Sequence, residues 1–94
     1  MINLNQAMEI AQAYLNDLQR DMGIPIQIVK TREESFGWIF FYQSKEYLDT
    51  ENFSAMLAGN TPFIVDKERA NVHVLGTAHP VDFYVDEYVR QQTK

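Results

Sequence analysis

The chain has 94 residues and no cysteine, which leaves room for one small domain and excludes disulfides, a cysteine nucleophile and thiolate metal sites. Hydrophobic residues make up 46% of the chain and charged residues 22%, which are the proportions of a folded domain and not of a disordered chain. The formal net charge is −5 and the eight Lys and Arg residues are scattered, so the composition disfavours nucleic-acid binding and suits a basic protein partner.

The N-terminal segment predicts an amphipathic helix. Its apolar residues recur at alternating spacings of four and three, which places them on one helix face: Leu4, Met8, Ala11, Leu15, Leu18 and Met22. Asn3 is a suitable N-cap with Gln6 three residues later, and Gly23 and Pro25 end the helix. Polar residues fall on the opposite side, so we expect this helix to lie on a sheet with its polar side in water.

Two strands follow. Ile26 and Ile28 alternate with a polar residue, which predicts a strand that fades in the polar segment 31–35. Residues 37–43 are rich in aromatic and β-branched residues and predict a strand near the middle of the sheet, apolar on both faces. We expect the helices to cover one face, and a loop, a second copy of the protein or a partner to cover the other.

A long connection spans residues 44–61. Phe53, Met56 and Leu57 have helical spacing within it, which predicts one helical turn. Long connections in small domains are often functional, so this segment is a candidate for partner specificity. The alternative is that these three side chains close one end of the core.

The last third predicts a hairpin and a helix. Strands at 62–66 and 72–75 are joined by a polar loop, in which Asn71 suits a left-handed conformation. Pro80 opens a helix whose buried face carries Val81, Tyr84, Val85 and Tyr88. The whole chain, residues 1–94, is thus predicted to form a single α+β domain of order α-β-β-loop-β-β-α, with a four-stranded, mainly antiparallel sheet.

Catalytic and metal-binding constellations are not apparent in the sequence. An enzyme that uses Asp66 or His79 has no accompanying nucleophile, base and orienting group. His73 and His79 are six residues apart without the spacing of metal ligands, and we expect both on the surface. Paired carboxylates lie in segments that look solvated, where they suit an acidic rim for a basic partner better than acid–base chemistry. We therefore expect no enzyme, cofactor or metal.

The predicted location is the cytoplasm. The N-terminus has no basic region followed by an apolar run, and the longest apolar stretch, around residues 38–42, is too short to span a bilayer. We expect no membrane association.

Three blocks of sequence carry a resemblance to a known family. The first is Gly-Trp-Ile-Phe-Phe-Tyr-Gln-Ser at 37–44 followed by Tyr47-Leu48, the second spans 57–67, and the third is Leu-Gly-Thr-Ala at 75–78 with Pro80 and Tyr84. These blocks, in this order, are similar to those of the immunity protein 35 family, which includes the YrhB-like proteins. A departure lies at Ala70-Asn71, where relatives often carry Gly in the hairpin loop.

This resemblance implies a small bacterial protein that binds a cognate toxin domain of a contact-dependent or polymorphic toxin system and neutralises it by occlusion, without catalysis. Some YrhB-like members are described as chaperone-like, so the alternative is a holdase that binds unfolded proteins. The family offers no catalytic motif to carry over. Its shared blocks serve either the fold or the binding of a partner.

We expect binding through the exposed side of the sheet and the 44–60 loop, with aromatic anchors inside an acidic rim. The residues assigned to this surface are Glu33, Glu34, Ile39, Phe41, Tyr47, Asp49, Glu51 and Asn52. A homodimer is the rival explanation for an exposed apolar face, because a second copy would bury that face.

Overall fold

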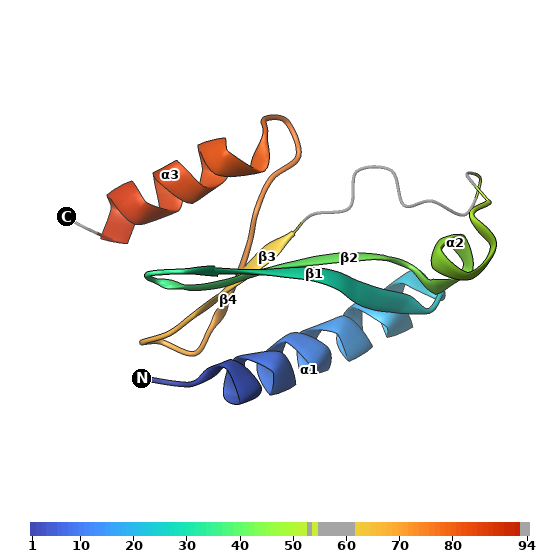
Figure 1. Ribbon diagram of the computed structural model, residues 1–94, viewed down its shortest axis with the longest axis horizontal. Coiled ribbons are helices and arrows are strands. Elements are labelled where there is room, and N and C mark those ends of the chain that lie inside the picture. Colours follow the sequence, from blue (N-terminus) through green and yellow to red (C-terminus); the bar gives the residue numbers. More distant parts are fainter. Residues whose placement is uncertain (53, 55–61, 93–94) are drawn as a thin grey trace.

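A four-stranded antiparallel sheet lies between two helices (Figure 1). The computed structural model describes residues 1–52, 54 and 62–92. Its elements, in chain order, are α1 (Leu4–Met22), β1 (Ile26–Glu34), β2 (Gly37–Ser44), α2 (Lys45–Thr50), β3 (Phe63–Asp66), β4 (Val72–Val74) and α3 (Val81–Gln92). The strands follow one another in the order β1-β2-β3-β4. The predicted α+β class and the predicted order of helices and strands are confirmed.

Helix α1 begins and ends as its sequence predicts. The Asn3 side chain accepts a hydrogen bond from the Gln6 amide, the Gln6 side chain accepts one from the Asn3 amide, and Gly23 ends the helix in a left-handed conformation. The buried face differs from the prediction, because its centre is formed by Ala7, Ala11 and Leu15. Small alanine side chains let the helix approach the aromatic face of the sheet closely, and this turns the larger Leu4, Met8 and Met22 out to the flank, where they are 40–45% exposed.

Strand β1 is longer than predicted. It continues through the polar segment to Glu34, in register with β2 from Ile26 opposite Ser44 to Glu34 opposite Gly37. The expectation that it fades at residue 31 is wrong, because backbone pairing with β2 does not need apolar side chains at the edge of a sheet. A shift in register between Ile28 and Lys30 marks a β-bulge within the strand.

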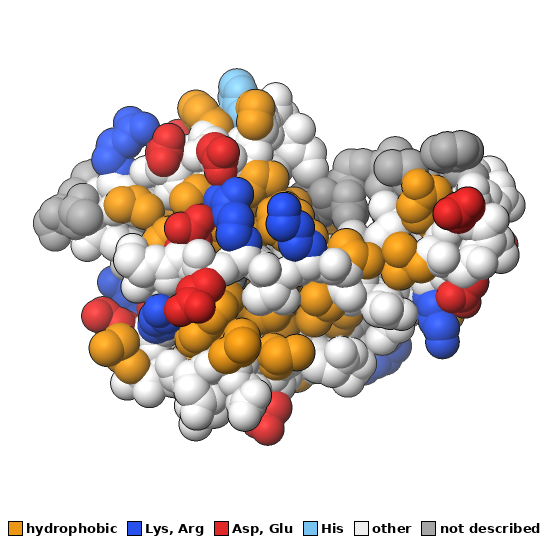
Figure 2. Space-filling view, viewed as in Figure 1, with side chains coloured by type: hydrophobic (Ala, Val, Ile, Leu, Met, Phe, Trp, Pro, Cys, Tyr) orange, Lys and Arg blue, Asp and Glu red, His pale blue; other side chains and the backbone are white. Residues whose placement is uncertain are grey.

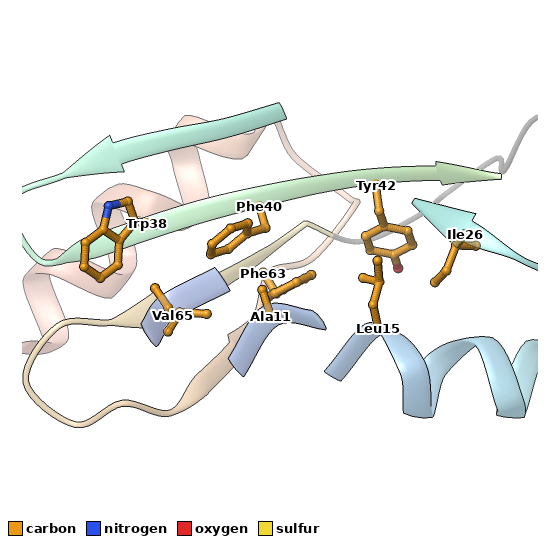
Figure 3. Close-up of a cluster of buried hydrophobic side chains, with 9 residues drawn as sticks. Ala11, Leu15, Ile26, Trp38, Phe40, Tyr42, Phe63 and Val65 are labelled. Atoms are coloured by element: carbon orange, nitrogen blue, oxygen red, sulfur yellow. The ribbon is translucent and has the colours of Figure 1, made fainter. Parts of the chain in front are cut away.

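The two faces of the sheet carry separate hydrophobic clusters. On the α1 side, aromatic residues of β2 and β3 pack against the helix (Figure 3): Trp38, Phe40, Tyr42 and Phe63, with Ile26, Val65 and Leu15. On the other side, Ile39 and Ile64 pack against Leu75 and the α3 residues Val85 and Tyr88. The buried face predicted for the C-terminal helix is therefore confirmed.

Helices α1 and α3 lie on opposite faces of the sheet (Figure 1). The expectation that both helices share one face, leaving the other to a loop, a second copy or a partner, is wrong. Since both faces of β2 are apolar, one helix on each face buries more apolar surface than two helices on the same face.

The connections also depart from the prediction in detail. Helix α2 follows β2 directly, and the Ser44 side chain caps it by accepting a hydrogen bond from the Tyr47 amide. It therefore lies earlier in the chain than the helical turn expected around residues 53–57. Phe53, Met56 and Leu57 lie outside the described residues. In the loop between β3 and β4 the left-handed residue is Ala70, with φ 55°, and not Asn71.

Candidate partner-binding surface

The residues assigned to a partner surface lie at opposite ends of the sheet. Glu33 and Glu34 end β1, beside the turn into β2, whereas residues 47–52 follow the far end of β2. Strand β2 has 8 residues, which corresponds to about 25 Å between these groups. The fold therefore does not gather them into one acidic rim.

Ile39 is part of the core and not of a surface. Its side chain is fully buried between the sheet and α3, in the cluster that contains Ile64 and Val85. The assignment of Ile39 to a binding surface is wrong, because the face it points to is covered by the chain itself. The holdase alternative depended on the same apolar face being open, and α3 covers that face too.

Phe41, Glu33 and Glu34 each make contacts within the chain. Phe41 is half-buried, and the Nζ of Lys30 lies 5.6 Å from the centre of its ring. The Arg32 Nε lies 2.9 Å from Glu34 Oε1, and the Lys67 Nζ lies 3.5 Å from Glu33 Oε2. Such partly exposed ion pairs contribute about 0–1 kcal/mol each, so both carboxylates stay available to other cations.

The opposite end of the sheet carries α2, which has no buried residue. Asp49, Glu51 and Asn52 are exposed and Tyr47 is half-buried. Leu48 is 37% exposed between them. Figure 2 shows acidic and hydrophobic side chains side by side at this end of the molecule. We call residues 46–52 the α2 tip; it combines exposed carboxylates with an apolar side chain.

Asp66 and Tyr88 join the β3–β4 loop to α3. The Oδ1 of Asp66 accepts hydrogen bonds from the amides of Glu68 (2.8 Å) and Arg69 (2.9 Å), and its Oδ2 accepts one from the Tyr88 hydroxyl. Burial by itself raises the pKa of Asp66, but the hydrogen bonds from Tyr88 and the two amides outweigh it and hold that pKa below its usual value. Burial, and then the bond to Asp66, raises the pKa of Tyr88.

Both oxygens of this buried carboxylate accept hydrogen bonds from its own chain, so it suits a structural role better than acid–base chemistry. A cavity of about 250 Å³ opens beside it, lined by Met1, Ser35, Phe36, Asp66, Lys67, Glu68, Arg69 and Gln92. His79 is exposed, as predicted, and its ring lies 4.2 Å from that of Phe83.

Gly76 and Tyr84 fix the start of α3. A Cβ atom at Gly76 would lie 2.6 Å from the Tyr84 ring, so the ring packs directly on this glycine. The Tyr84 hydroxyl accepts hydrogen bonds from the amides of Ala78 (2.9 Å) and His79 (3.1 Å). This contact holds the segment before α3 against the first turn of the helix.

Gly37, which opens the first sequence block, also has a local structural role. A Cβ at Gly37 would lie 2.1 Å from the Val65 carbonyl oxygen, and its φ is 156°. Trp38, Phe40 and Tyr42 then point to α1, and Asp66 binds Tyr88. These residues of the first and second blocks, with Gly76 and Tyr84 of the third, therefore serve the fold, whereas Tyr47-Leu48 of the first block lies on the exposed helix α2.

Two further observations concern binding of other kinds. Within residues 1–52, 54 and 62–92, no three His, Cys, Asp or Glu side chains come together as a metal would require. None of the helices in this part of the chain is both long and apolar enough to cross a membrane.

The chain is an α+β domain in which the described buried Asp66 and the described Gly37 and Gly76 make contacts that hold the fold. The chain belongs to the immunity protein 35 family, whose model matches residues 5–89. It is 39% identical over 88 residues to the "Uncharacterized protein YrhB" of Escherichia coli (strain K12), a match that covers 94% of this chain and 89% of that protein. No solved structure matches the chain.

Proposed function

We propose that the protein is an immunity protein that binds a cognate toxin domain in the cytoplasm and neutralises it by occluding the toxin's active site. The observation that carries this proposal is the family match, which spans residues 5–89. The hydrogen-bonded Asp66 and the contacts of Gly37 and Gly76 hold the fold, so we expect inhibition to rest on surface contact, without chemistry from this chain.

The α2 tip is the proposed contact surface. Its carboxylates at Asp49 and Glu51 flank the exposed Leu48 and the half-buried Tyr47, a mixture of charge and apolar area that suits a protein interface. The formal net charge of −5 would steer a basic toxin towards this protein.

Backbone conformation at Glu51 supports this choice. Glu51 ends α2 with φ 55°, a left-handed conformation that glycine adopts without strain and that costs other residues roughly 1–2 kcal/mol. A glutamate at such a position lowers the stability of the domain, and backbone strain of this kind is most often found at functional sites.

The test begins with capture of the tagged protein from a lysate of its host, followed by measurement of its affinity for the toxin domain recovered. We expect the double variant Asp49→Lys, Glu51→Lys to bind that domain at least about tenfold more weakly, since it replaces two attractive charges with repulsive ones. Tyr47→Ala should weaken binding similarly, because aromatic anchors dominate interfaces. Growth of cells that express the toxin domain gives the second readout.

The matched control is Glu9→Lys on the outer side of α1, combined with Glu87→Lys on α3, which makes the same change in net charge away from the tip. Circular dichroism melting checks that every variant is folded. If the control weakens binding and the tip variant does not, the surface assignment is wrong and the immunity function stands. If no toxin domain is recovered and the protein protects no cell, the immunity function itself falls.

A further inference from the structure

We propose that two copies of this protein pair through the outer edges of β1, antiparallel and centred on Arg32, to form one continuous sheet. The inference is independent of the toxin-binding function. It commits the β1 edge to a second copy of the chain, and three features of the strand carry it: its open edge, its bulge and its charges.

Within residues 1–52, 54 and 62–92, the outer edge of β1 is open. This strand ends the sheet, and among the described residues it pairs with β2 alone. Helices α1 and α3 cover the two faces of the sheet, above and below it in Figure 1, and so neither lies across this edge. Unpaired backbone N–H and C=O groups along such an edge can add another strand.

The bulge divides β1 and defines which part can pair regularly. The shift in register between Ile28 and Lys30 interrupts the strand at Val29, whereas residues 30–34 continue in unbroken register with β2. The segment available to a second copy is therefore Lys-Thr-Arg-Glu-Glu, with Arg32 at its centre.

The charges of this segment are complementary to themselves when it is reversed. Lys30, Arg32 and Glu34 point to the α3 side of the sheet, because they lie opposite Phe41, Ile39 and Gly37 of β2. An antiparallel copy centred on Arg32 places Lys30 opposite Glu34 of the second copy, and symmetry repeats this pair. Directly opposite side chains in antiparallel strands have Cβ atoms about 5 Å apart, within reach of an ion pair.

The central Arg32 does not oppose this register. Its Nε lies 2.9 Å from Glu34 Oε1, and one of its terminal nitrogens lies 2.9 Å from Asp82 Oδ1, so carboxylates of its own chain compensate its charge. A register centred on Thr31 instead would place Lys30 opposite Arg32 twice. The charges therefore select the Arg32-centred register over its neighbour.

Charged edges usually prevent strand pairing, and here they make it selective. A lysine on an edge strand repels an arbitrary strand because its charge loses water without gaining a partner. A second copy of β1 supplies the missing carboxylate at the required position. The same residues thus exclude other strands and accept their own reversed copy.

Charge reversal tests this pairing by sedimentation over a dilution series up to the highest soluble concentration. We expect the unmodified protein to dimerise weakly, since the paired segment is short. Lys30→Glu and Glu34→Lys should each weaken association about tenfold or more, because each turns two attractive pairs into two repulsive ones. An equimolar mixture of these two variants should restore association, and so should the double variant K30E/E34K.

The control for charge alone is Glu87→Lys on the outer side of α3, which makes the same change in net charge as Glu34→Lys and should associate as the unmodified protein does. Circular dichroism confirms that each variant is folded. Loss in the single variants with recovery in the mixture supports the proposal. A monomer at every concentration, single variants that associate normally, or a mixture that stays monomeric overturns it.

Discussion

Asp66 is a candidate catalytic residue in the sequence, but its contacts in the fold are structural. An acid that ends an apolar strand is a reasonable candidate for a site, and it is 5% exposed. Its oxygens are nevertheless taken by two amides of the following loop and by Tyr88, 22 positions along the chain. This single carboxylate ties a hairpin to the helix that covers it.

We predict that Tyr88→Phe lowers the free energy of unfolding at pH 7 by about 1.5–3 kcal/mol, the range for a hydrogen bond to a charged group. The difference between the two proteins should depend on pH. The pKa of Asp66 is lowered in the folded state, so its stabilising contribution is present above its unfolded value, about 3.9, and is lost as the pH falls through the lower folded value. Urea unfolding at pH 7 and at pH 3 measures both effects.

Tyr14→Phe is the matched control. Tyr14 packs on Phe63 with ring centres 4.6 Å apart, and no hydrogen bond to a carboxylate is found for its hydroxyl among the described residues. Removal of the Tyr14 hydroxyl should change the free energy of unfolding little, and by the same amount at pH 7 and pH 3. If Tyr88→Phe lowers the free energy of unfolding equally at pH 7 and pH 3, the Tyr88 hydroxyl does not bond to the charged Asp66 carboxylate, which would contradict this assignment.

At the scale of elements, α3 is set in place by its approach segment. Gly76 lies in the segment after β4, and the Tyr84 ring packs against it, while the Tyr84 hydroxyl accepts hydrogen bonds from the amides of Ala78 and His79. The helix then places Val85 and Tyr88 on the sheet. A tight contact between one glycine and one ring thus decides where a whole helix begins.

This contact predicts a strong coupling between two substitutions. Gly76→Ala should lower the free energy of unfolding by about 1–3 kcal/mol, the usual cost of an overpacked side chain. In a Tyr84→Ala background its cost should fall below about 0.5 kcal/mol, because the atoms it meets are gone. Denaturant unfolding of the four proteins in this double-mutant cycle measures the coupling.

Gly23→Ala provides the comparison. Gly23 has φ 74° and open space around its Cβ position, so its replacement costs about 1 kcal/mol through backbone conformation alone. That cost should be the same with or without Tyr84. A Gly76→Ala cost that also stays constant would show that the Tyr84 ring moves aside freely.

At the scale of the molecule, β2 and β3 belong to both cores. Neighbouring residues such as Phe63 and Ile64 point to α1 and α3 respectively, so the two hydrophobic clusters share a single sheet. Loss of packing on one face should therefore destabilise the other. A domain of this size generally unfolds as one cooperative unit.

Val85→Ala tests this cooperativity from the α3 side. We expect it to lower the stability of the domain by about 1–2 kcal/mol, and its melting temperature by roughly 4–8 °C for each kcal/mol. Fluorescence of Trp38, the single tryptophan of the chain, reports the transition from the α1 side. Val89→Ala, at a position 39% exposed on the same helix, should change the melting temperature little.

If Val85→Ala leaves the Trp38 transition in place while the far-ultraviolet signal falls at lower temperature, α3 unfolds separately and the two cores are independent. Coincident shifts by both probes would show that the sheet couples them. This outcome also decides how far a substitution on one face can affect a surface formed by the other.

Much of this architecture was predictable from local chemistry. The Asn3–Gln6 capping box, the stop at Gly23 and the two-faced apolar strand at 37–43 depend on neighbours in sequence, and the structure has all three. The surface position of His73 and His79 followed from their context as well. The candidate site was predicted less well, because membership of a surface depends on what distant segments cover.

Sequence alone thus determined the first and last helices, the four strands, their order and the apolar character of both sheet faces, because dihedral preferences, caps and side-chain periodicity are local properties. Only the tertiary structure decided that α3 covers the second face, that Ile39 is buried and that Tyr88 donates a hydrogen bond to Asp66. It also decided that the acidic residues divide between two ends of the sheet. These features depend on contacts between residues far apart in the chain, and such contacts form only when the layers pack.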